Sequence, residues 1–384
     1  MLARLRVPGG RLRAAQLAAV ADFALQGNGI VELTSRANLQ VRGLADKPSE
    51  GFARSVAAVG LLPSPEHERV RNVLASPLAG RHAAARLAVD EIVVALDRGL
   101  CADPELAGLP GRVLFLVEDG SGVLAGLAHD VALAPAQSGG IALLVDGVDS
   151  GLRTTEPRAA AGLALRAAHA FLAASRVHPG SWSVRELPGG AADVIARIAG
   201  AAADPAPERV RWPAVAPSPL APGIARQRDG RIALTALAPL GRLSAIQLCT
   251  LAHLAPEIRV SPWRTVTVLD LPDGEASSVE RVLRDLGLVV EADSGWAGLS
   301  ACAGLGACVS AQADVRAAAA ARAAVRLPGA PAEHWAACPR RCGERSGMPV
   351  AVAVLDAGVS VRRVANDALV GDVEAALGLL GDSE

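Results

Sequence analysis

The stretch Gly10-Arg-Leu-Arg-Ala-Ala-Gln-Leu17 recurs 231 residues later as Gly241-Arg-Leu-Ser-Ala-Ile-Gln-Leu248, with two substitutions. Each octet opens a helical pattern in which apolar residues recur every three to four positions, over 12–26 and 243–254. Two β-rich runs and a second helical stretch follow each helix. In the first copy the β-rich runs are 30–33 and 39–42, and the second helix is 49–59. In the second copy the runs are 258–260 and 265–269, and the second helix is 275–286. This internal repeat predicts a small α+β sandwich built from two related halves.

The rest of the chain divides around these two copies. Upstream of the second octet, 229–237 reads as a turn and a strand, and at the same offset Met1 aligns with Ile232. We therefore expect the first copy to lack this leading turn and to have a truncated N-terminal strand. Between the copies the patterns predict helices over 82–100, 157–175 and 191–203 and strands over 112–118 and 141–146. The predicted domains are 1–62, 66–202, 224–288 and 289–384, with a Pro/Ala-rich linker at 203–223.

Composition excludes several classes of function. Of 384 residues, 38 are Lys or Arg and 39 are Asp or Glu, so a net charge of −1 provides no global field for nucleic acid or a membrane surface. Lys47 is the only lysine. Mean hydropathy is positive, at +0.32, but a long uncharged stretch, 294–312, is rich in Gly, Ser and Cys and predicts no membrane span. Six cysteines and no signal-peptide pattern predict a cytoplasmic protein with reduced thiols.

Four of the six cysteines form two close pairs, Cys302 with Cys308 and Cys338 with Cys342. Four thiolates in this Cys-x5-Cys and Cys-x3-Cys arrangement can hold one inorganic centre, and the glycine-rich first loop lets backbone amides approach it. A [4Fe-4S] cluster is the first candidate, because zinc ribbons mostly use tighter spacing. Four buried, inert cysteines are the other alternative. Cys101 and Cys249 are isolated in apolar surroundings and predict core positions.

These cysteines, the repeat and the run Leu33-Thr-Ser-Arg-Ala-Asn-Leu-Gln-Val-Arg-Gly43 together resemble the nitrite/sulfite reductase superfamily. The resemblance covers essentially the whole chain. It implies an α+β fold with two ferredoxin-like half domains and two larger α/β cluster-type domains, related by a pseudo-twofold axis. It also implies a [4Fe-4S] cluster, held by the four paired cysteines, beside a sirohaem.

The resemblance assigns a set of tetrapyrrole-binding or substrate-binding residues. They are Arg36, Asn38, Gln40, Arg42, Arg71, Asn72, Arg112 and Arg264, of which Arg36, Arg71 and Arg112 are the catalytic candidates. Reductases of the family carry two lysines in a Leu-Pro-x-Lys-Phe-Lys strand, where this chain has Arg112 and Leu114. Arginine does not give up a proton near neutral pH, and leucine neither donates a proton nor attracts an anion. This substitution disfavours the reductase chemistry.

Within the superfamily, the runs 4–10, 71–80 and 260–264 resemble the precorrin-3B synthase branch. That resemblance implies a monooxygenase that uses dioxygen to hydroxylate precorrin-3A at C20 and closes a γ-lactone, a step of cobalamin biosynthesis. Sirohaem and precorrin-3A are both polycarboxylate tetrapyrroles, so one cleft could hold either of them. Ala337 stands where the family usually has glycine. The alternatives are a sirohaem-dependent nitrite or sulfite reductase and a non-catalytic [4Fe-4S] protein of the same fold.

The expected cofactors are the cluster and a mononuclear non-haem iron, with sirohaem less favoured. No iron ligands are assigned, because the seven histidines are scattered; His129 and His334 are the two of most interest. The Gly-x-Gly runs at 120–122 and 304–306 are too short for a nucleotide fingerprint. Electrons from NADH are therefore expected to arrive through a separate reductase. The internal twofold makes a monomer sufficient.

Overall fold

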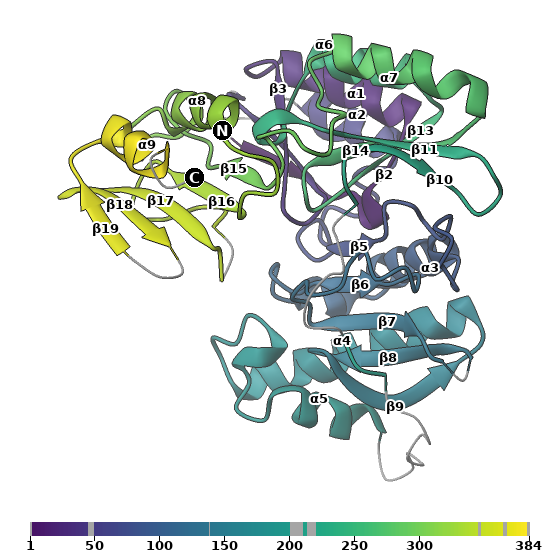
Figure 1. The fold of residues 1–384 in the computed structure, drawn as a ribbon. Coiled ribbons are helices and arrows are strands. Elements are labelled where there is room, and N and C mark those ends of the chain that lie inside the picture. Colours follow the sequence, from purple (N-terminus) through teal and green to yellow (C-terminus); the bar gives the residue numbers. More distant parts are fainter. Residues whose placement is uncertain are drawn as a thin grey trace.

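The computed structural model describes residues 2–44, 50–137, 139–199, 210–212, 220–344, 347–363 and 367–381 (Figure 1). Within these residues the strands form four sheets. Most of the predicted linker, 203–223, lies outside the described residues, as does the end of the helix predicted over 191–203. The fold is mixed α+β, as the sequence predicts.

The two copies of the repeat fold into two related helix-and-sheet halves. The first contains β1 (Leu2–Leu5), β2 (Arg11–Arg13), α1 (Ala14–Leu25), β3 (Ile30–Leu33), β4 (Leu39–Arg42) and α2 (Glu50–Ala58). The second contains β10 (Gly223–Arg226), β11 (Ile232–Leu237), β12 (Arg242–Ser244), α6 (Ala245–Leu254), β13 (Glu257–Val260), β14 (Thr265–Leu271) and α7 (Ala276–Asp285). Among the described residues the first copy has no counterpart of β10, so the first sheet has four strands and the second has five.

The two halves exchange their edge strands. β2 of the first copy pairs with β13 of the second, whereas β12 of the second copy pairs with β3 of the first. The sheet orders are therefore β1-β4-β3-β12 and β10-β11-β14-β13-β2. Helices α1 and α6 pack together, and both halves contribute side chains to one shared hydrophobic core. The repeat predicts two halves, but the exchange that interlocks them is visible only in the structure.

The octet forms the same local structure in both copies. Gln16 Oε1 accepts a hydrogen bond from Arg13 N, and Gln247 Oε1 accepts one from Ser244 N, so the glutamine caps the following helix in each case. The glycine that opens each octet has a positive φ, +67° at Gly10 and +71° at Gly241. A Cβ at Gly10 would lie only 2.1 Å from the carbonyl oxygen of Val260. Only glycine lets the exchanged strand approach its partner this closely.

Two larger α/β units follow the two halves in the chain. The middle unit contains β5 (Val73–Ala75), α3 (Val89–Ala102), β6 (Phe115–Val117), β7 (Val131–Pro135), β8 (Ile141–Val145), β9 (Val148–Thr154), α4 (Pro157–Val177) and α5 (Gly190–Ala199). The C-terminal unit contains β15 (Leu299–Ala301), α8 (Val315–Val325), β16 (Glu333–Ala336), β17 (Val350–Leu355), β18 (Gly358–Arg363), β19 (Asp367–Val370) and α9 (Val373–Gly381). Short 3₁₀ helices occur at Pro8–Gly10, Pro104–Gly108, Val184–Glu186, Pro239–Gly241 and Asp273–Glu275.

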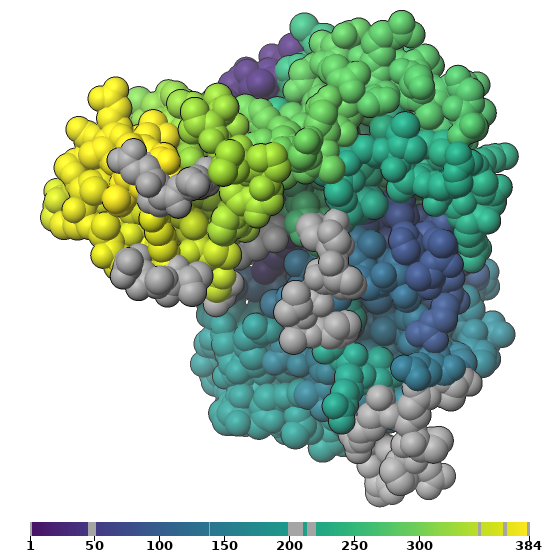
Figure 2. Space-filling view, in the orientation of Figure 1, coloured from purple at the N-terminus to yellow at the C-terminus, as the bar shows by residue number. Residues whose placement is uncertain are grey.

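The two α/β units have the same sheet topology. In each, the first three strands are parallel and the last two pairings are antiparallel, in the orders β5-β6-β7-β8-β9 and β15-β16-β17-β18-β19. Each unit has its own core. The C-terminal unit projects to one side of the two halves, and the middle unit lies below them (Figure 2). Half domain and α/β unit are thus each present twice, as the resemblance implies.

The helix predicted over 82–100 is too long at its start. The observed helix α3 begins at Val89, and residues 82–88 are not helical. The backbone N–H groups of Arg86 and Leu87 both donate to the carbonyl oxygen of Asp119, in a loop of the same unit. This tertiary hydrogen bonding replaces the helical pattern there. No helix among the described residues is long and apolar enough to cross a membrane.

Candidate functional site

All four paired cysteines line one cavity of about 420 Å³ between the sheet β1-β4-β3-β12 and the C-terminal unit. Cys302 directly follows β15, and Cys338 lies two residues beyond β16. Because β15 and β16 are adjacent and parallel, their carboxyl ends meet at the same edge of the sheet. Cys308 and Cys342 lie in the two loops that leave this edge. Sheet topology therefore brings together two pairs that are thirty residues apart in sequence.

The backbone around these cysteines donates a hydrogen bond to one sulfur and forms a tight loop between Cys302 and Cys308. The N–H of Ala337 donates to Sγ of Cys302 at 3.3 Å, and the N–H of Cys308 donates to the carbonyl oxygen of Gly304 at 3.1 Å. Gly304 and Gly306 have φ values of +74° and +79°, which fold the first loop back on itself. The amide at position 337 reaches the sulfur even though alanine stands there in place of glycine.

The four thiols are close enough to influence one another. Cys338 is buried, and Cys342 lies exposed at the cavity rim. Partial burial, followed by the charges of Cys338, Cys302 and Cys308, raises the pKa of the Cys342 thiol. In the part of the chain that the structure describes, no three His, Cys, Asp or Glu side chains converge tightly enough to bind a single metal ion. The thiols are spread around the cavity instead.

Four arginines complete the lining of the cysteine cavity: Arg4, Arg42, Arg264 and Arg316. Arg42 donates to Glu32 Oε2 at 2.7 Å and to Gln40 Oε1 at 3.3 Å, and Gln40 also lines the cavity. Arg264 adopts φ +62° in the turn between β13 and β14. The side chain of Arg264 lies over Gly241: a Cβ added to Gly241 would be 2.3 Å from Cδ of Arg264. Gln40, Arg42 and Arg264 are thus the predicted ligands that the structure places with the cysteines.

Arg316, on α8, is a functional candidate that the sequence patterns missed. Its guanidinium donates to the carbonyl oxygens of Cys302 and Leu240, both at 3.0 Å, and its side chain is buried. Burial and the nearby charge of Arg242 lower the pKa of Arg316 to about 10. A buried guanidinium that donates only to carbonyl oxygens leaves positive charge beside Cys302. The Ala-rich helix around it carries no signal for this role. Arg4 lies on the same face of β1 as Leu2, which also lines the cavity, and the pairing of β1 with β4 brings both residues there.

Arg36 and Arg112 lie apart from the cysteine cavity. Arg36 Nη1 donates to the carbonyl oxygen of Gly111 at 3.2 Å, and burial lowers the pKa of Arg36. Arg112 is largely exposed, with Nη1 3.8 Å from Glu186 Oε1. Leu114 is buried, and its N–H donates to Asp130. Position 114 thus contributes a backbone contact and an apolar side chain.

Asn38, Arg71 and Asn72 fasten the first half to the middle unit. Arg71 forms a bidentate ion pair with Asp97 at 2.7 and 2.8 Å and is buried. Asn38 Nδ2 donates to Asn72 Oδ1 at 3.1 Å, and its own Oδ1 accepts from the N–H of Val7. Asn72 Nδ2 faces backbone carbonyls of the middle unit. These side chains are engaged in protein contacts, and they do not line the cysteine cavity.

The two singled-out histidines have ordinary protein partners. His129 packs edge-on against Trp212, with ring centroids 4.5 Å apart, and burial lowers its pKa. His334 is fully buried, with Nδ1 2.9 Å from Ser300 Oγ and Nε2 3.2 Å from the carbonyl oxygen of Cys342. His334 therefore braces the loop that carries Cys342.

Comparison with known proteins agrees with this architecture. Residues 1–58 match the family model of the nitrite/sulfite reductase ferredoxin-like half domain. A ferredoxin–nitrite reductase of Synechococcus elongatus is 34% identical over 148 residues, a match that spans 36% of this chain but only 29% of the relative. The NirA protein of Mycobacterium tuberculosis superposes with a TM-score of 0.75 at 20% identity, covering 99% of this chain and 79% of NirA. The chain has the NirA fold, which confirms the predicted fold class.

Proposed function

We propose that this chain is an oxidoreductase that binds a [4Fe-4S] cluster and a polycarboxylate tetrapyrrole side by side, and that it acts as a precorrin-3B synthase. The observation that carries the proposal is a single cavity of about 420 Å³ lined by four cysteines and four arginines. Thiolates are the usual ligands of iron–sulfur clusters, and arginine is the side chain best suited to bidentate binding of carboxylates.

The cluster is assigned to Cys302, Cys308, Cys338 and Cys342. A cluster is larger than one ion, so ligands spread around a cavity suit it. The Ala337 N–H that donates to Cys302 Sγ would hydrogen-bond a ligating thiolate, a contact that tunes cluster potential. Bound here, the cluster would supply single electrons to the neighbouring site. The positive charge of Arg316 would offset part of its negative charge.

The tetrapyrrole is assigned to the arginine-lined side of the same cavity. Arg42 and Arg264 come from the predicted set, and Arg4 and Arg316 are added by the structure. They come from the paired strands β1 and β4, from the β13–β14 turn and from α8, so several elements contribute positive charge to the cavity. Such an arrangement suits a flat ligand with carboxylates around its periphery.

Position 114 favours precorrin-3A over nitrite or sulfite as the substrate. Leu114 is buried and apolar, and Arg112 is turned toward Glu186, so neither supplies the proton donors that anion reduction needs. In the proposed reaction dioxygen hydroxylates precorrin-3A at C20 and a γ-lactone closes. Reducing equivalents come from NADH through a separate reductase.

A sirohaem-dependent nitrite reductase is the second candidate, and one observation favours it. The curated relative that matches 148 residues of this chain at 34% identity is a ferredoxin–nitrite reductase. In this alternative the same cysteines and arginines would hold the cluster and a sirohaem, but Arg36 and Arg112, the expected anion ligands, lie outside the cysteine cavity.

A visible spectrum of the purified protein, followed by a turnover assay, separates the two candidates. We expect a broad iron–sulfur shoulder without sirohaem bands, together with dioxygen-dependent conversion of precorrin-3A. Cys338→Ser should lose both, while Cys249→Ser, which changes a cysteine on α6 away from the cavity, should keep both. Intense sirohaem bands in the isolated protein would establish the reductase instead. A cluster without turnover of either substrate would leave only an electron-transfer or structural role.

A further inference from the structure

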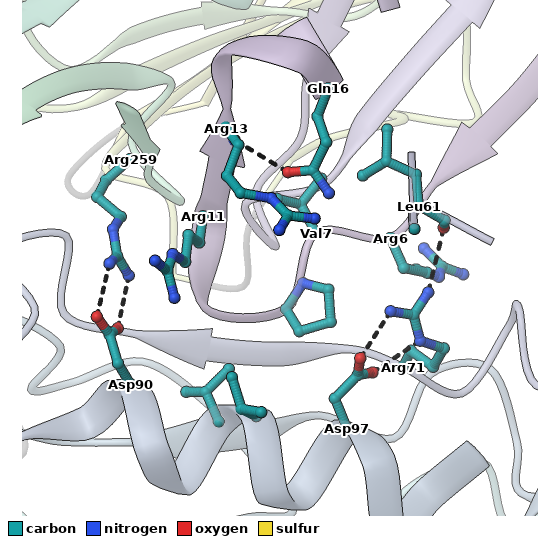
Figure 3. A pocket seen from close by; sticks show the side chains of 14 residues that line it. Arg6, Val7, Arg11, Arg13, Gln16, Leu61, Arg71, Asp90, Asp97 and Arg259 are labelled. Atoms are coloured by element: carbon teal, nitrogen blue, oxygen red, sulfur yellow. Dashed lines mark hydrogen bonds and ion pairs between the residues drawn. The ribbon is translucent and has the colours of Figure 1, made fainter. Parts of the chain in front are cut away.

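A second cavity, of about 230 Å³, lies between helix α3 and the exchanged strand β2 (Figure 3). Five arginines line it: Arg6, Arg11, Arg13, Arg71 and Arg259. The only acidic residues of this lining are Asp90 and Asp97. None of the four paired cysteines reaches this cavity.

Two ion pairs close the cavity at its ends. Arg259 donates to both oxygens of Asp90 at 2.8 Å, and Arg71 donates to both oxygens of Asp97 at 2.7 and 2.8 Å (Figure 3). Asp90 and Asp97 are seven residues apart on α3, which places them two turns apart on the same face of the helix. Both aspartates are thus already neutralised by an arginine each.

Two of the three remaining arginines, Arg6 and Arg13, carry uncompensated charge. Arg11 pairs with Glu257, but Arg6 donates only to the carbonyl oxygens of Glu68 and Arg69. Among the described residues the guanidinium of Arg13 has no hydrogen-bond or ion-pair partner, and Figure 3 shows it directed into the cavity. Burial, only partly opposed by Glu68, lowers the pKa of Arg6 to about 10. Two positive charges in excess therefore face the same space.

A buried N–H donor of Arg259 supports the binding of a ligand in this cavity. The side chain of Arg259 is 1% exposed, and its Nη2 also donates to Glu257 Oε1 at 2.6 Å. Among the residues that the structure describes, its Nε has no hydrogen-bond partner. A buried N–H without an acceptor is costly, and a bound anion is one way to satisfy it.

The internal repeat places this cavity opposite the cysteine cavity. Arg11 of the first octet pairs with Glu257 across β2 and β13, and Arg242 of the second octet pairs with Glu32 across β12 and β3. Glu32 lines the cysteine cavity, whereas Arg259 occupies the matching strand position in the second one. The repeat thus builds two related recesses, of which one carries cysteines and the other carries additional arginine.

We propose that the cavity between α3 and β2 is a binding site for a small dianion, carried by a phosphate group or by a pair of carboxylates, with Arg13 and Arg6 as its ligands. Arginine binds both kinds of oxyanion through paired N–H donors. The volume corresponds to roughly eight water molecules, at about 30 Å³ each, which admits a group of this size. The site does not depend on the cluster or on the reaction proposed above.

Calorimetric titration of the purified protein with inorganic phosphate and, separately, with succinate tests the site. We expect one of the two to bind with one site per chain, and Arg13→Gln and Arg6→Gln each to weaken that binding about tenfold. Phosphate binding indicates a phosphorylated ligand, and succinate binding indicates a dicarboxylate. Arg281→Gln is the control, because it removes the same charge from an exposed position on α7.

Three results would overturn the proposal: no binding of either anion, unchanged binding in Arg13→Gln, or equal weakening in Arg281→Gln. Arg13 is exposed, so its variant should fold, and circular dichroism of both variants checks this.

Discussion

Arg316 forms no ion pair within the described part of the chain, although its side chain is buried beside Cys302. Arg71 is also buried, but it does form an ion pair, because its Nε and Nη2 both donate to Asp97. The sequence motifs select Arg71 as a ligand and pass over Arg316. The structure reverses their order of interest, because Asp97 neutralises Arg71 through a bidentate pair, whereas Arg316 donates only to carbonyl oxygens.

Replacement of Arg316 by glutamine is expected to lower the reduction potential of the proposed cluster. Removing a nearby positive charge disfavours the more negative, reduced state, by on the order of 50 mV, or about a tenfold change in the one-electron equilibrium. Redox titration followed by electron paramagnetic resonance measures the shift. Arg281→Gln should leave the potential unchanged. An unchanged potential in Arg316→Gln would separate this arginine from the cluster.

Replacement of Arg71 by alanine is expected to reduce stability more than binding. The change leaves Asp97 without its buried partner, which should lower the free energy of unfolding by about 3 kcal/mol. Urea denaturation measures this loss. Full stability together with abolished tetrapyrrole binding would instead restore Arg71 as a direct ligand.

Glu118, in the loop 118–124 of the middle unit, should make the free energy of unfolding depend on pH. Burial, followed by the charge of Asp119, raises the pKa of Glu118 to about 7, above the ordinary value of 4.5. A carboxyl whose pKa is higher in the folded state contributes stability that is complete below its unfolded pKa and is lost as pH rises through the folded one. This contribution should therefore decline between about pH 4.5 and pH 7. The matched control is Glu118→Gln, because the glutamine side chain cannot ionise.

Unfolding free energies measured at several pH values for both proteins isolate this contribution. The unfolding free energy of wild type should fall relative to that of Glu118→Gln as pH rises from 4.5 to 7. A constant difference across that range would show that Glu118 does not titrate there.

The contact between β2 and β13 depends on a single glycine. Gly10 and Gly29 both have positive φ, but a Cβ at Gly10 meets the Val260 oxygen at 2.1 Å while a Cβ at Gly29 meets nothing within 4 Å. Gly29→Ala should cost about 1 kcal/mol of unfolding free energy, from backbone strain alone. Gly10→Ala should cost at least about 3 kcal/mol, because strain and the clash add. Equal losses, measured by urea denaturation, would argue against the tight strand exchange.

Elements that depend on local pattern are the ones the sequence predicts well. The strands over 30–33 and 39–42 are found as predicted. The capped helices of both repeats begin two residues later than predicted, because 12–13 and 243–244 belong to β2 and β12. Residues 82–88 are not helical, because Asp119, far along the chain, accepts their hydrogen bonds. The exchange of β2 and β12 likewise depends on contacts more than 200 residues apart, which no local pattern records.

The same distinction applies to the candidate site. The spacing of the cysteines is a local signal, and the parallel pairing of β15 with β16 then gathers them at one edge. Arg4 reaches the cavity because β1 pairs with β4 opposite Gln40, and Arg316 reaches it because α8 packs on β15. Both placements depend on tertiary contacts. The sequence could therefore predict the four cysteines that line the cavity but only part of its arginine set.

The molecule as a whole consists of one interlocked pair of halves that presents two recesses. The C-terminal unit covers one recess and brings the cysteines, and the middle unit covers the other and brings Asp90 and Asp97. One duplicated scaffold thus places a candidate redox site and a candidate anion site on related surfaces. What differs between them is the α/β unit that packs against each.

Turnover of precorrin-3A under isotopically labelled dioxygen tests the central claim most directly. Mass spectrometry of the product should show one labelled oxygen at C20 and a closed γ-lactone, formed by wild type and Cys249→Ser but not by Cys338→Ser. Unconverted precorrin-3A, in a preparation that carries its cluster and reduces nitrite or sulfite, would contradict the account and establish the reductase.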